Sequence, residues 1–235
     1  MNELALFAGR GGGLLASKLL GWNTVCAVEY DKGHRDCLLQ RQRDGVLERF
    51  PIWDDIRTFD GKPWRGKINV LSGGFPCQGI SSAGEGKGLA DERSGLWSEY
   101  KRLIGEIGPD IVFAENSPLL RTRGLGQILE DLASLGYDAG WGDLGACQFG
   151  AHQRRERKWI VAKPIGSQWG EESHSREARR VGRLFKSVSW NTSSLVACAS
   201  FRGVDDGLAR DVGRTDGIRN GQVPVVAANA FRILS

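Results

Sequence analysis

The sequence predicts an α/β fold of the Rossmann-like kind, with a mostly parallel sheet, helices on both of its faces and a small basic lobe. Short apolar runs bounded by Gly, Pro or Asp recur along the chain, and stretches with helical spacing lie between them. This alternation is typical of a parallel sheet whose strands are joined by helices. At 235 residues, the chain is long enough for one substantial domain with a buried core.

Each element can be placed along the chain in order. Short apolar runs predict buried strands at residues 4–8, 24–28, 68–71, 111–114 and 159–162. Amphipathic spacing predicts helices at residues 13–20, 32–43, 94–107, 125–135 and 223–234. Residues 164–200, rich in Ser, Arg, Gly and Trp, show no clear periodicity, and we expect them to form the basic lobe.

The composition is that of an ordinary globular protein, with 40% apolar and 26% charged residues. Lys and Arg exceed Asp and Glu by 32 to 28, and the basic residues gather after residue 150. This suits a polyanionic partner, but a solvated basic surface explains it equally well. The five cysteines form no C-x-x-C pair, which predicts neither a metal site nor disulfides and favours a reducing cytoplasm. Neither a signal peptide nor a membrane span is expected.

A glycine-rich loop follows the first predicted strand, at residues 7–13, and opens a helix. Glycines at this position let the backbone approach a bound cofactor, although they also form plain tight connections. The second strand ends at Glu29 and Tyr30, and an acidic residue there can accept both hydroxyls of a ribose. We therefore predict an adenosine-binding half-site, in which Asp55 accepts from the adenine amino group and Ile56 packs on the ring; the alternative for residues 53–57 is a solvated turn.

A second loop, residues 73–81, places Cys77 directly after the third apolar strand. Ligands bind at the carboxyl edge of such sheets. Pro76 restricts the backbone and the flanking glycines leave room for a substrate. A lone cysteine usually packs in a core, so this loop alone predicts a nucleophile only weakly.

Five motifs in a fixed order make the prediction specific. They are Phe-Ala-Gly-x-Gly-Gly at 7–12, Pro-Cys-Gln at 76–78, Glu-Asn at 115–116, Gln-x-Arg-x-Arg at 153–157 and Asn-Gly-Gln-Val-Pro at 220–224. In these motifs, over residues 3–163 and 201–235, the chain resembles the bacterial and phage DNA cytosine-5 methyltransferases. An Asp-Pro-Pro-Tyr quartet, expected of enzymes that methylate amino groups, is absent from the sequence.

The resemblance implies an S-adenosylmethionine-dependent methyltransferase fold and a methyl transfer to carbon 5 of a flipped-out cytosine in double-stranded DNA, through a covalent adduct with Cys77. Cys77, Glu115, Arg155 and Arg157 are the implied catalytic residues. S-adenosyl-L-methionine is the implied cofactor, and its expected binding residues are Phe7, Gly9, Gly11, Glu29, Tyr30, Asp55, Ile56, Pro76 and Asn220. The expected DNA-binding residues are Gln78, Ser81, Arg93, Gln153, Arg179 and Arg180.

The expected organisation is a catalytic and cofactor-binding domain at 1–163, a short target-recognition lobe at 164–200 and a segment at 201–235 that packs back on the catalytic domain. This lobe is short for the family, so recognition is expected to be relaxed, supplied by a partner chain or lost. A monomer is expected, and a cognate restriction endonuclease is a candidate partner. Two alternative functions remain: an RNA (tRNA) cytosine-5 methyltransferase, and a degenerate DNA-binding relative that no longer methylates.

Overall fold

The computed structural model describes residues 1–76, 95–150, 155–169 and 221–235. Within them a seven-stranded sheet runs in the order β3-β2-β1-β4-β5-β7-β6. The strands are β1 (Asn2–Leu6), β2 (Asn23–Val28), β3 (Ile52–Trp53), β4 (Val70–Gly74), β5 (Ile111–Asn116), β6 (Tyr137–Gly145) and β7 (Glu156–Pro164). The α-helices are α1 (Gly12–Leu19), α2 (Lys32–Arg43), α3 (Leu96–Ile107), α4 (Leu120–Arg123), α5 (Leu125–Ser134) and α9 (Pro224–Leu234).

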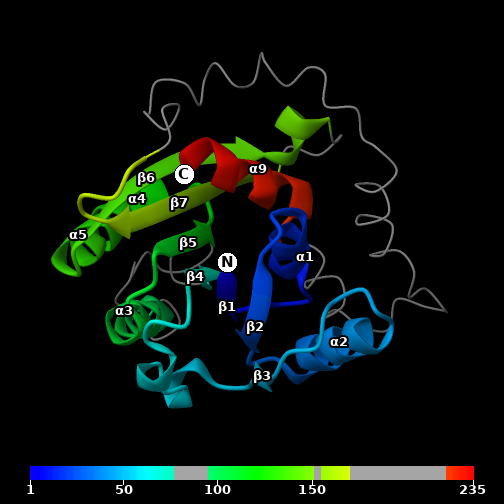
Figure 1. The fold of residues 1–235 in the computed structure, drawn as a ribbon. Helices are drawn as coiled ribbons and strands as arrows, with labels where there is room; N and C mark the ends of the chain where they lie inside the picture. Colours follow the sequence, from blue (N-terminus) through cyan, green and yellow to red (C-terminus); the bar gives the residue numbers. More distant parts are fainter. Residues whose placement is uncertain (77–94, 151–154, 170–220) are drawn as a thin grey trace.

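The sheet is parallel from β3 to β5, and β7 pairs antiparallel with both β5 and β6. Short 3-10 turns lie at Ile56–Thr58, Lys62–Trp64 and Ala146–Phe149. Figure 1 shows helices on both sides of this sheet, with α3 and α5 on one side and α1, α2 and α9 on the other. The mostly parallel sheet with helices on both faces is therefore confirmed.

Strand alternation explains why both faces are covered. Because successive side chains of a strand point to opposite faces, Leu4 and Leu6 enter the core beneath α3 and α5, whereas Ala5 packs with α1 and α2. The same alternation in β5 sends Val112 to the first core and Phe113 to the core beneath α9. A central sheet buried on both faces needs continuous apolar strands, which is the pattern that predicted it.

Helix α3 shows how an amphipathic sequence becomes a core element. Its buried residues recur at helical spacing, and they are Trp97, Tyr100, Leu103, Ile104 and Ile107. Burial of each such side chain stabilises the fold by about 1.5–3 kcal/mol. The buried Tyr100 hydroxyl donates to the carbonyls of Leu71 and Phe113, at 3.1 and 3.3 Å, so the helix is also tied to β4 and β5.

The predicted boundaries hold within a few residues, with two informative differences. Strand β1 ends at Leu6 rather than residue 8, because Phe7 has a φ of 51°, outside the extended region. Strand β6 was not predicted, because Gly140 and Gly142 break its apolar pattern. Pairing with β7 along its whole length, rather than intrinsic propensity, makes this segment a strand.

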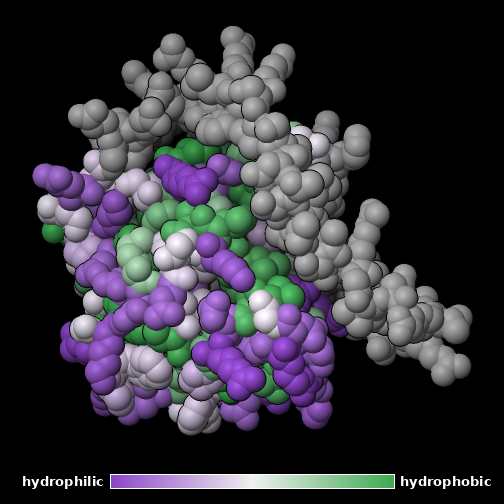
Figure 2. All heavy atoms as spheres, turned by 45° about the vertical axis from the view of Figure 1, so that its right-hand side comes forward, coloured by the Kyte–Doolittle hydropathy of each residue, from purple (hydrophilic) through white to green (hydrophobic). Residues whose placement is uncertain are grey.

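Helix α9 returns the chain to the sheet and packs against α1, β6 and β7 (Figure 1). Nearly all of the predicted lobe, and residues 201–220, lie outside the described residues, so the three-part division of the chain stays a prediction. Figure 2, turned so that the side of α1 and α2 comes forward, shows apolar patches surrounded by strongly hydrophilic residues. None of the helices in the described ranges is long and apolar enough to cross a membrane.

Candidate active site

The predicted site residues gather where the parallel strands end. Strands β1, β2, β4 and β5 run in the same direction, so Leu6, Val28, Gly74 and Asn116 bring the residues that follow them to one edge of the sheet. Ligands bind at this edge in open α/β folds. The geometry of the described residues at this edge therefore bears directly on the predicted chemistry.

The first glycine loop adopts a conformation that explains its sequence. Gly9 and Gly11 have φ values of 54° and 87°, in the left-handed region that glycine enters without strain. A Cβ atom on Gly11 would also lie 2.9 Å from the Leu38 side chain. Phe7 holds a φ of 51° despite its side chain, a strained conformation of the kind that clusters at functional sites.

Glu29, directly after β2, binds this loop. Its Oε2 accepts from the backbone N–H of Gly9 at 2.6 Å, and its Oε1 accepts from the backbone N–H of Asp31 at 2.8 Å. The residue is only 7% exposed, and its hydrogen bond raises the pKa of His34, whose Nδ1 lies 3.5 Å from Oε1. Oε2 keeps a second lone pair, and Oε1 has only the longer 3.5 Å contact with His34 besides its bond from Asp31, so the carboxylate can still accept ribose hydroxyls.

The remaining residues predicted for the adenosine half-site differ in exposure. Tyr30 is 70% exposed, and the Arg57 guanidinium lies 5.7 Å from the centre of its ring. The Asp55 carboxylate pairs with Arg57, Nη2 to Oδ2 at 2.8 Å, which lowers the Asp55 pKa. Ile56 is 4% exposed and packs in the core with α3, so its contact with an adenine ring stays a prediction.

Glu115 is the central polar group at the end of β5. It is 8% exposed, and its Oε1 pairs with Nε of Arg157 at 2.9 Å. Burial raises the pKa of Glu115, while the Arg157 and Arg155 guanidinium groups and a hydrogen bond from Gln222 oppose the rise. The structure thus unites three residues that are far apart in sequence: Glu115, Arg157 and Gln222, the last of which sequence reasoning did not assign to the site.

Arg155 holds the neighbouring backbone. Its Nη2 donates to the carbonyl oxygen of Gly221, and its own φ is 33°, again unusual for a residue with a side chain. Burial and the nearby Arg157 lower the Arg155 pKa, yet a guanidinium stays charged at all physiological pH values. Arg155 therefore joins the arginine motif to the segment before α9.

Asn116 links β5 to the loop that leads toward Cys77. Its side-chain nitrogen donates to the carbonyl of Phe75 at 3.3 Å, and its Oδ1 accepts from the N–H of Ser117 at 2.7 Å. The residue is 3% exposed. Pro76 follows Phe75 directly, so Asn116 fixes the start of the loop that carries the predicted nucleophile.

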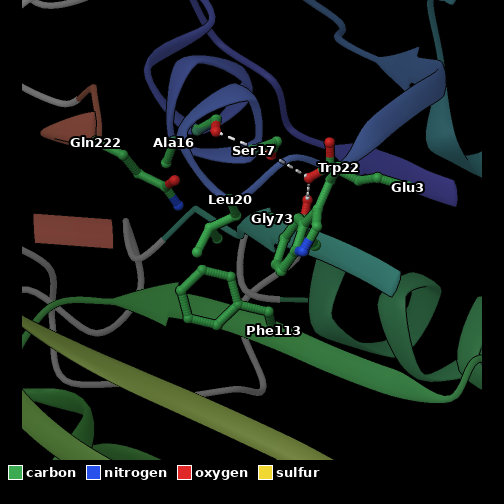
Figure 3. A pocket seen from close by; sticks show the side chains of 10 residues that line it. Glu3, Ala16, Ser17, Leu20, Trp22, Gly73, Phe113 and Gln222 are labelled. Atoms are coloured by element: carbon green, nitrogen blue, oxygen red, sulfur yellow. Dashed lines mark hydrogen bonds between the residues drawn. The ribbon is translucent and has the colours of Figure 1, made fainter. Parts of the chain in front are cut away.

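A second buried carboxylate, Glu3, lies within β1 and belongs to no predicted role. It accepts hydrogen bonds from the hydroxyls of Ser17 at 2.7 Å, Ser72 at 2.5 Å and Thr24 at 2.7 Å. Figure 3 shows it beside a small pocket whose lining includes Trp22. Burial raises the Glu3 pKa, and the three hydroxyl groups oppose the rise.

Several predicted site residues lie outside the described residues. They are Cys77, Gln78, Ser81, Arg93, Gln153, Arg179, Arg180 and Asn220. Their roles stay predictions. Among the residues that the structure describes, no group of three or more His, Cys, Asp or Glu side chains could hold a metal ion.

Comparison with known families decides the class of protein. The family model described as "C-5 cytosine-specific DNA methylase" matches residues 1–189. The chain belongs to this family. The predicted family is thereby confirmed. The matched region contains Glu29, Glu115, Arg155 and Arg157.

Known relatives include Type II methyltransferases of bacteria. The chain is 35% identical over 168 residues to M.Eco47II of Escherichia coli, which covers 68% of this chain and 38% of that protein. It is 40% identical over 227 residues to M.BsuRI of Bacillus subtilis, covering 83% of this chain and 51% of that protein. The chain thus spans from about two fifths to half of the length of these two relatives.

Solved structures show the same fold. The S. pombe Dnmt2 methyltransferase superposes with a TM-score of 0.60 at 20% identity, covering 82% of this chain and 57% of that one. The Entamoeba histolytica methyltransferase EhMeth gives a TM-score of 0.59 at 16% identity, covering 72% of this chain and 55% of that one. The Rossmann-like methyltransferase fold is therefore confirmed.

Family membership implies S-adenosylmethionine as the cofactor, and the described residues fit it. Glu29 offers a buried carboxylate beside the glycine loop, and the left-handed Gly9 and Gly11 carry no side chains that would keep a ligand from the backbone. Two exposed aromatic residues, Tyr30 at 70% exposure and Trp53 at 45%, lie next to this edge and offer rings for contact with a planar ligand. An acceptor for ribose beside a glycine loop and stacking surfaces is the set of groups that an adenosyl moiety needs.

Proposed function

We propose that this chain carries the catalytic centre of a DNA cytosine-5 methyltransferase, which transfers a methyl group from S-adenosylmethionine to carbon 5 of cytosine. The observation that carries the proposal is the ion pair between the buried Glu115 and the partly buried Arg157, 2.9 Å between Oε1 and Nε, at the end of β5. Asn116, the next residue, ties the same point to the backbone of Phe75, two residues before Cys77. The Glu115 carboxyl group, the Arg157 guanidinium and the backbone that leads to Cys77 thus lie at the same edge of the sheet.

The proposed reaction begins with a covalent bond. Carbon 5 of cytosine is too poor in electrons to accept a methyl group directly, so the Cys77 thiolate first adds to carbon 6, and the electron pair moves into the ring. Carbon 5 then becomes nucleophilic. When bound, S-adenosylmethionine supplies the methyl group that carbon 5 receives. Loss of the carbon 5 proton then restores the double bond and breaks the sulfur–carbon bond.

Glu115 is proposed to hold a proton at nitrogen 3 of the ring. Addition of sulfur at carbon 6 places negative charge on that part of the base, and a protonated carboxyl group there stabilises it as a general acid. A general acid works best when its pKa is near the working pH. Burial raises the Glu115 pKa toward that range, which is the direction this role requires.

The two arginines are proposed to act as fixed cations. Arg157 orients the Glu115 carboxylate through the pair at 2.9 Å, and Arg155 is proposed to contact the carbonyl oxygen of the ring. Both guanidinium groups remain charged while protons move elsewhere. The target base must leave the DNA stack to reach this edge, which costs a few kcal/mol that contacts with the DNA must offset.

The proposal also covers the partners of the chain. Double-stranded DNA is the proposed substrate, read in part by Gln78, Ser81, Arg93, Gln153, Arg179 and Arg180. The names of the relatives, Type II methyltransferases, support a restriction-modification role and a cognate endonuclease. A monomer acting in the cytoplasm completes the proposal, in keeping with the cysteine pattern.

Labelled S-adenosylmethionine tests the proposal directly. We expect the chain to label cytosine-containing duplex DNA, with 5-methylcytosine as the product after hydrolysis. Cys77→Ser should bind the cofactor as before and transfer no methyl group. Labelling of RNA alone would favour the RNA enzyme, whereas cofactor binding without any transfer would indicate a non-methylating relative. Methylation of the exocyclic nitrogen, or full activity of Cys77→Ser, would contradict the mechanism.

A further inference from the structure

Gln222 lies between the cofactor loop and the catalytic carboxyl group. A Cβ atom on Gly13 would lie 2.6 Å from the Gln222 Oε1, and one on Gly12 would lie 2.2 Å from its backbone oxygen. A Cβ atom on Gly74 would meet the Glu115 Oε2 at 2.5 Å and the Gln222 Nε2 at 3.3 Å. The amide oxygen therefore faces the start of α1, and the amide nitrogen faces the same point above Gly74 as the Oε2 atom of Glu115.

Figure 3 agrees with these contacts. Figure 3 shows the Gln222 side chain reaching from the segment before α9 to a position beside Ala16 of α1. Helix α9 packs directly on α1, and Arg155 holds the adjacent carbonyl of Gly221. The backbone that carries Gln222 is thus fixed from two sides, so its side chain is well suited to fix another group.

We propose that Gln222 is a positioning residue, whose amide holds the second oxygen of Glu115 and thereby sets both the orientation and the protonation of this carboxyl group. This inference deepens the proposed function and rests on it for its role in catalysis. Gln222 does not touch the reacting atoms in this arrangement; it acts through Glu115.

The two oxygens of the Glu115 carboxyl group have different partners, which supports the proposal. Arg157 occupies Oε1 at 2.9 Å, and Gln222 donates from the other side, so the carboxylate cannot rotate between orientations. The donated hydrogen bond favours the ionised form and lowers the Glu115 pKa against the effect of burial. Removal of this donor should therefore make Glu115 hold its proton to a higher pH.

The small residues around Gln222 add a link to the cofactor. Gly12, Gly13 and Gly74 leave space that any Cβ atom would fill, and Gln222 occupies it. The same loop carries Gly9, which binds Glu29. One side chain therefore contacts the backbone of the cofactor loop and the catalytic carboxyl group together.

Gln222→Met tests the inference, because methionine matches the length and packing of glutamine but donates no hydrogen bond. The titration of Glu115 can be followed by NMR in the full chain with carboxyl-labelled glutamate, and Glu115→Gln identifies its signal. Gln127→Met is the matched control, since Gln127 also donates to a carboxylate, that of Asp131 at 3.3 Å, on the exposed side of α5. Gln222→Asn, which keeps an amide on a shorter side chain, provides a second variant should the methionine variant not fold.

The expected result is a higher titration midpoint of Glu115 in Gln222→Met and Gln222→Asn and an unchanged midpoint in Gln127→Met. In methyl transfer, kcat should fall on the order of tenfold, with the alkaline limb of its pH profile moved upward and KM for the cofactor within about twofold. An unchanged Glu115 midpoint in the Gln222 variants would overturn the inference. A wild-type chain that transfers no methyl group would refute the proposed function instead, and the NMR titration would still decide the role of Gln222.

Discussion

Neutralisation of Glu29 gives the sharpest test of the cofactor half of the site. Glu29 accepts from Gly9 at 2.6 Å and from Asp31 at 2.8 Å, and its remaining lone pairs are those proposed for the ribose. Glu29→Gln keeps the size of the side chain but removes the charge and turns one acceptor into a donor. The cofactor then exchanges two charge-assisted hydrogen bonds for one neutral bond and one mismatch.

The size of the effect follows from this exchange. Hydrogen bonds to charged groups contribute about 1.5–3 kcal/mol each, and neutral ones about 1 kcal/mol. The net loss is about 2–5 kcal/mol, which corresponds to a rise of about 30-fold to 5000-fold in the Kd for S-adenosylmethionine. Calorimetric titration of the DNA-free protein measures it without reference to catalysis.

A matched control separates the site from general effects of charge. Glu106 of α3 also accepts from a backbone N–H, that of Gly61 at 2.9 Å, but lies away from the glycine loop. Glu106→Gln should leave the Kd within about twofold. A Glu29→Gln protein that binds the cofactor as tightly as the Glu106→Gln protein would refute the assignment of Glu29 to the ribose.

Two further predictions concern the catalytic side and the core. Gly74→Ala should reduce methyl transfer strongly, because the new Cβ atom would lie 2.5 Å from Oε2 of Glu115 and 3.3 Å from Nε2 of Gln222 and would displace the carboxyl group from its partners. Gly126→Ala, whose Cβ atom meets nothing within 4 Å in α5, should keep activity and add about 0.5–1 kcal/mol of stability; equal activity of both variants would disprove the steric reasoning. For Glu3, burial raises the folded pKa above the unfolded value of 4.5, so its contribution to stability is full below that value and declines as the pH rises through the folded pKa. Urea denaturation from pH 4 to pH 8 should therefore show a weaker decline for Glu3→Gln than for the wild type, and parallel curves would contradict the prediction.

The sequence predicted those parts of the fold that depend on local patterns. Apolar runs and helical spacing identify β1, β2, β5 and α3, because each of these elements buries a face whose period can be read along the chain. Strand β6 escaped prediction because Gly140 and Gly142 interrupt its pattern, and only its pairing with β7 holds it extended. Antiparallel insertion of β7 between β5 and β6 likewise depends on tertiary pairing.

The site shows the same division. Glu29, Glu115 and Arg157 could be predicted because each stands directly after a strand or within a recognisable motif. Gln222 could not, because its role arises from contacts with residues more than a hundred positions away, and its only signal was its place in the terminal motif. Backbone strain at Phe7 and Arg155 is equally invisible in residue type, since neither favours a positive φ.

The most direct test of the central claim is covalent trapping on duplex DNA that carries 5-fluorocytosine at its target positions. Fluorine at carbon 5 leaves no proton to lose after methylation, so a sulfur–carbon 6 bond, once formed, persists and can be located by mass spectrometry of proteolytic fragments. We predict a cofactor-dependent adduct on the peptide that contains Cys77, absent in Cys77→Ser and reduced in Glu115→Gln. Methylation of unsubstituted DNA with no trapped adduct, or an adduct on another cysteine, would contradict the account.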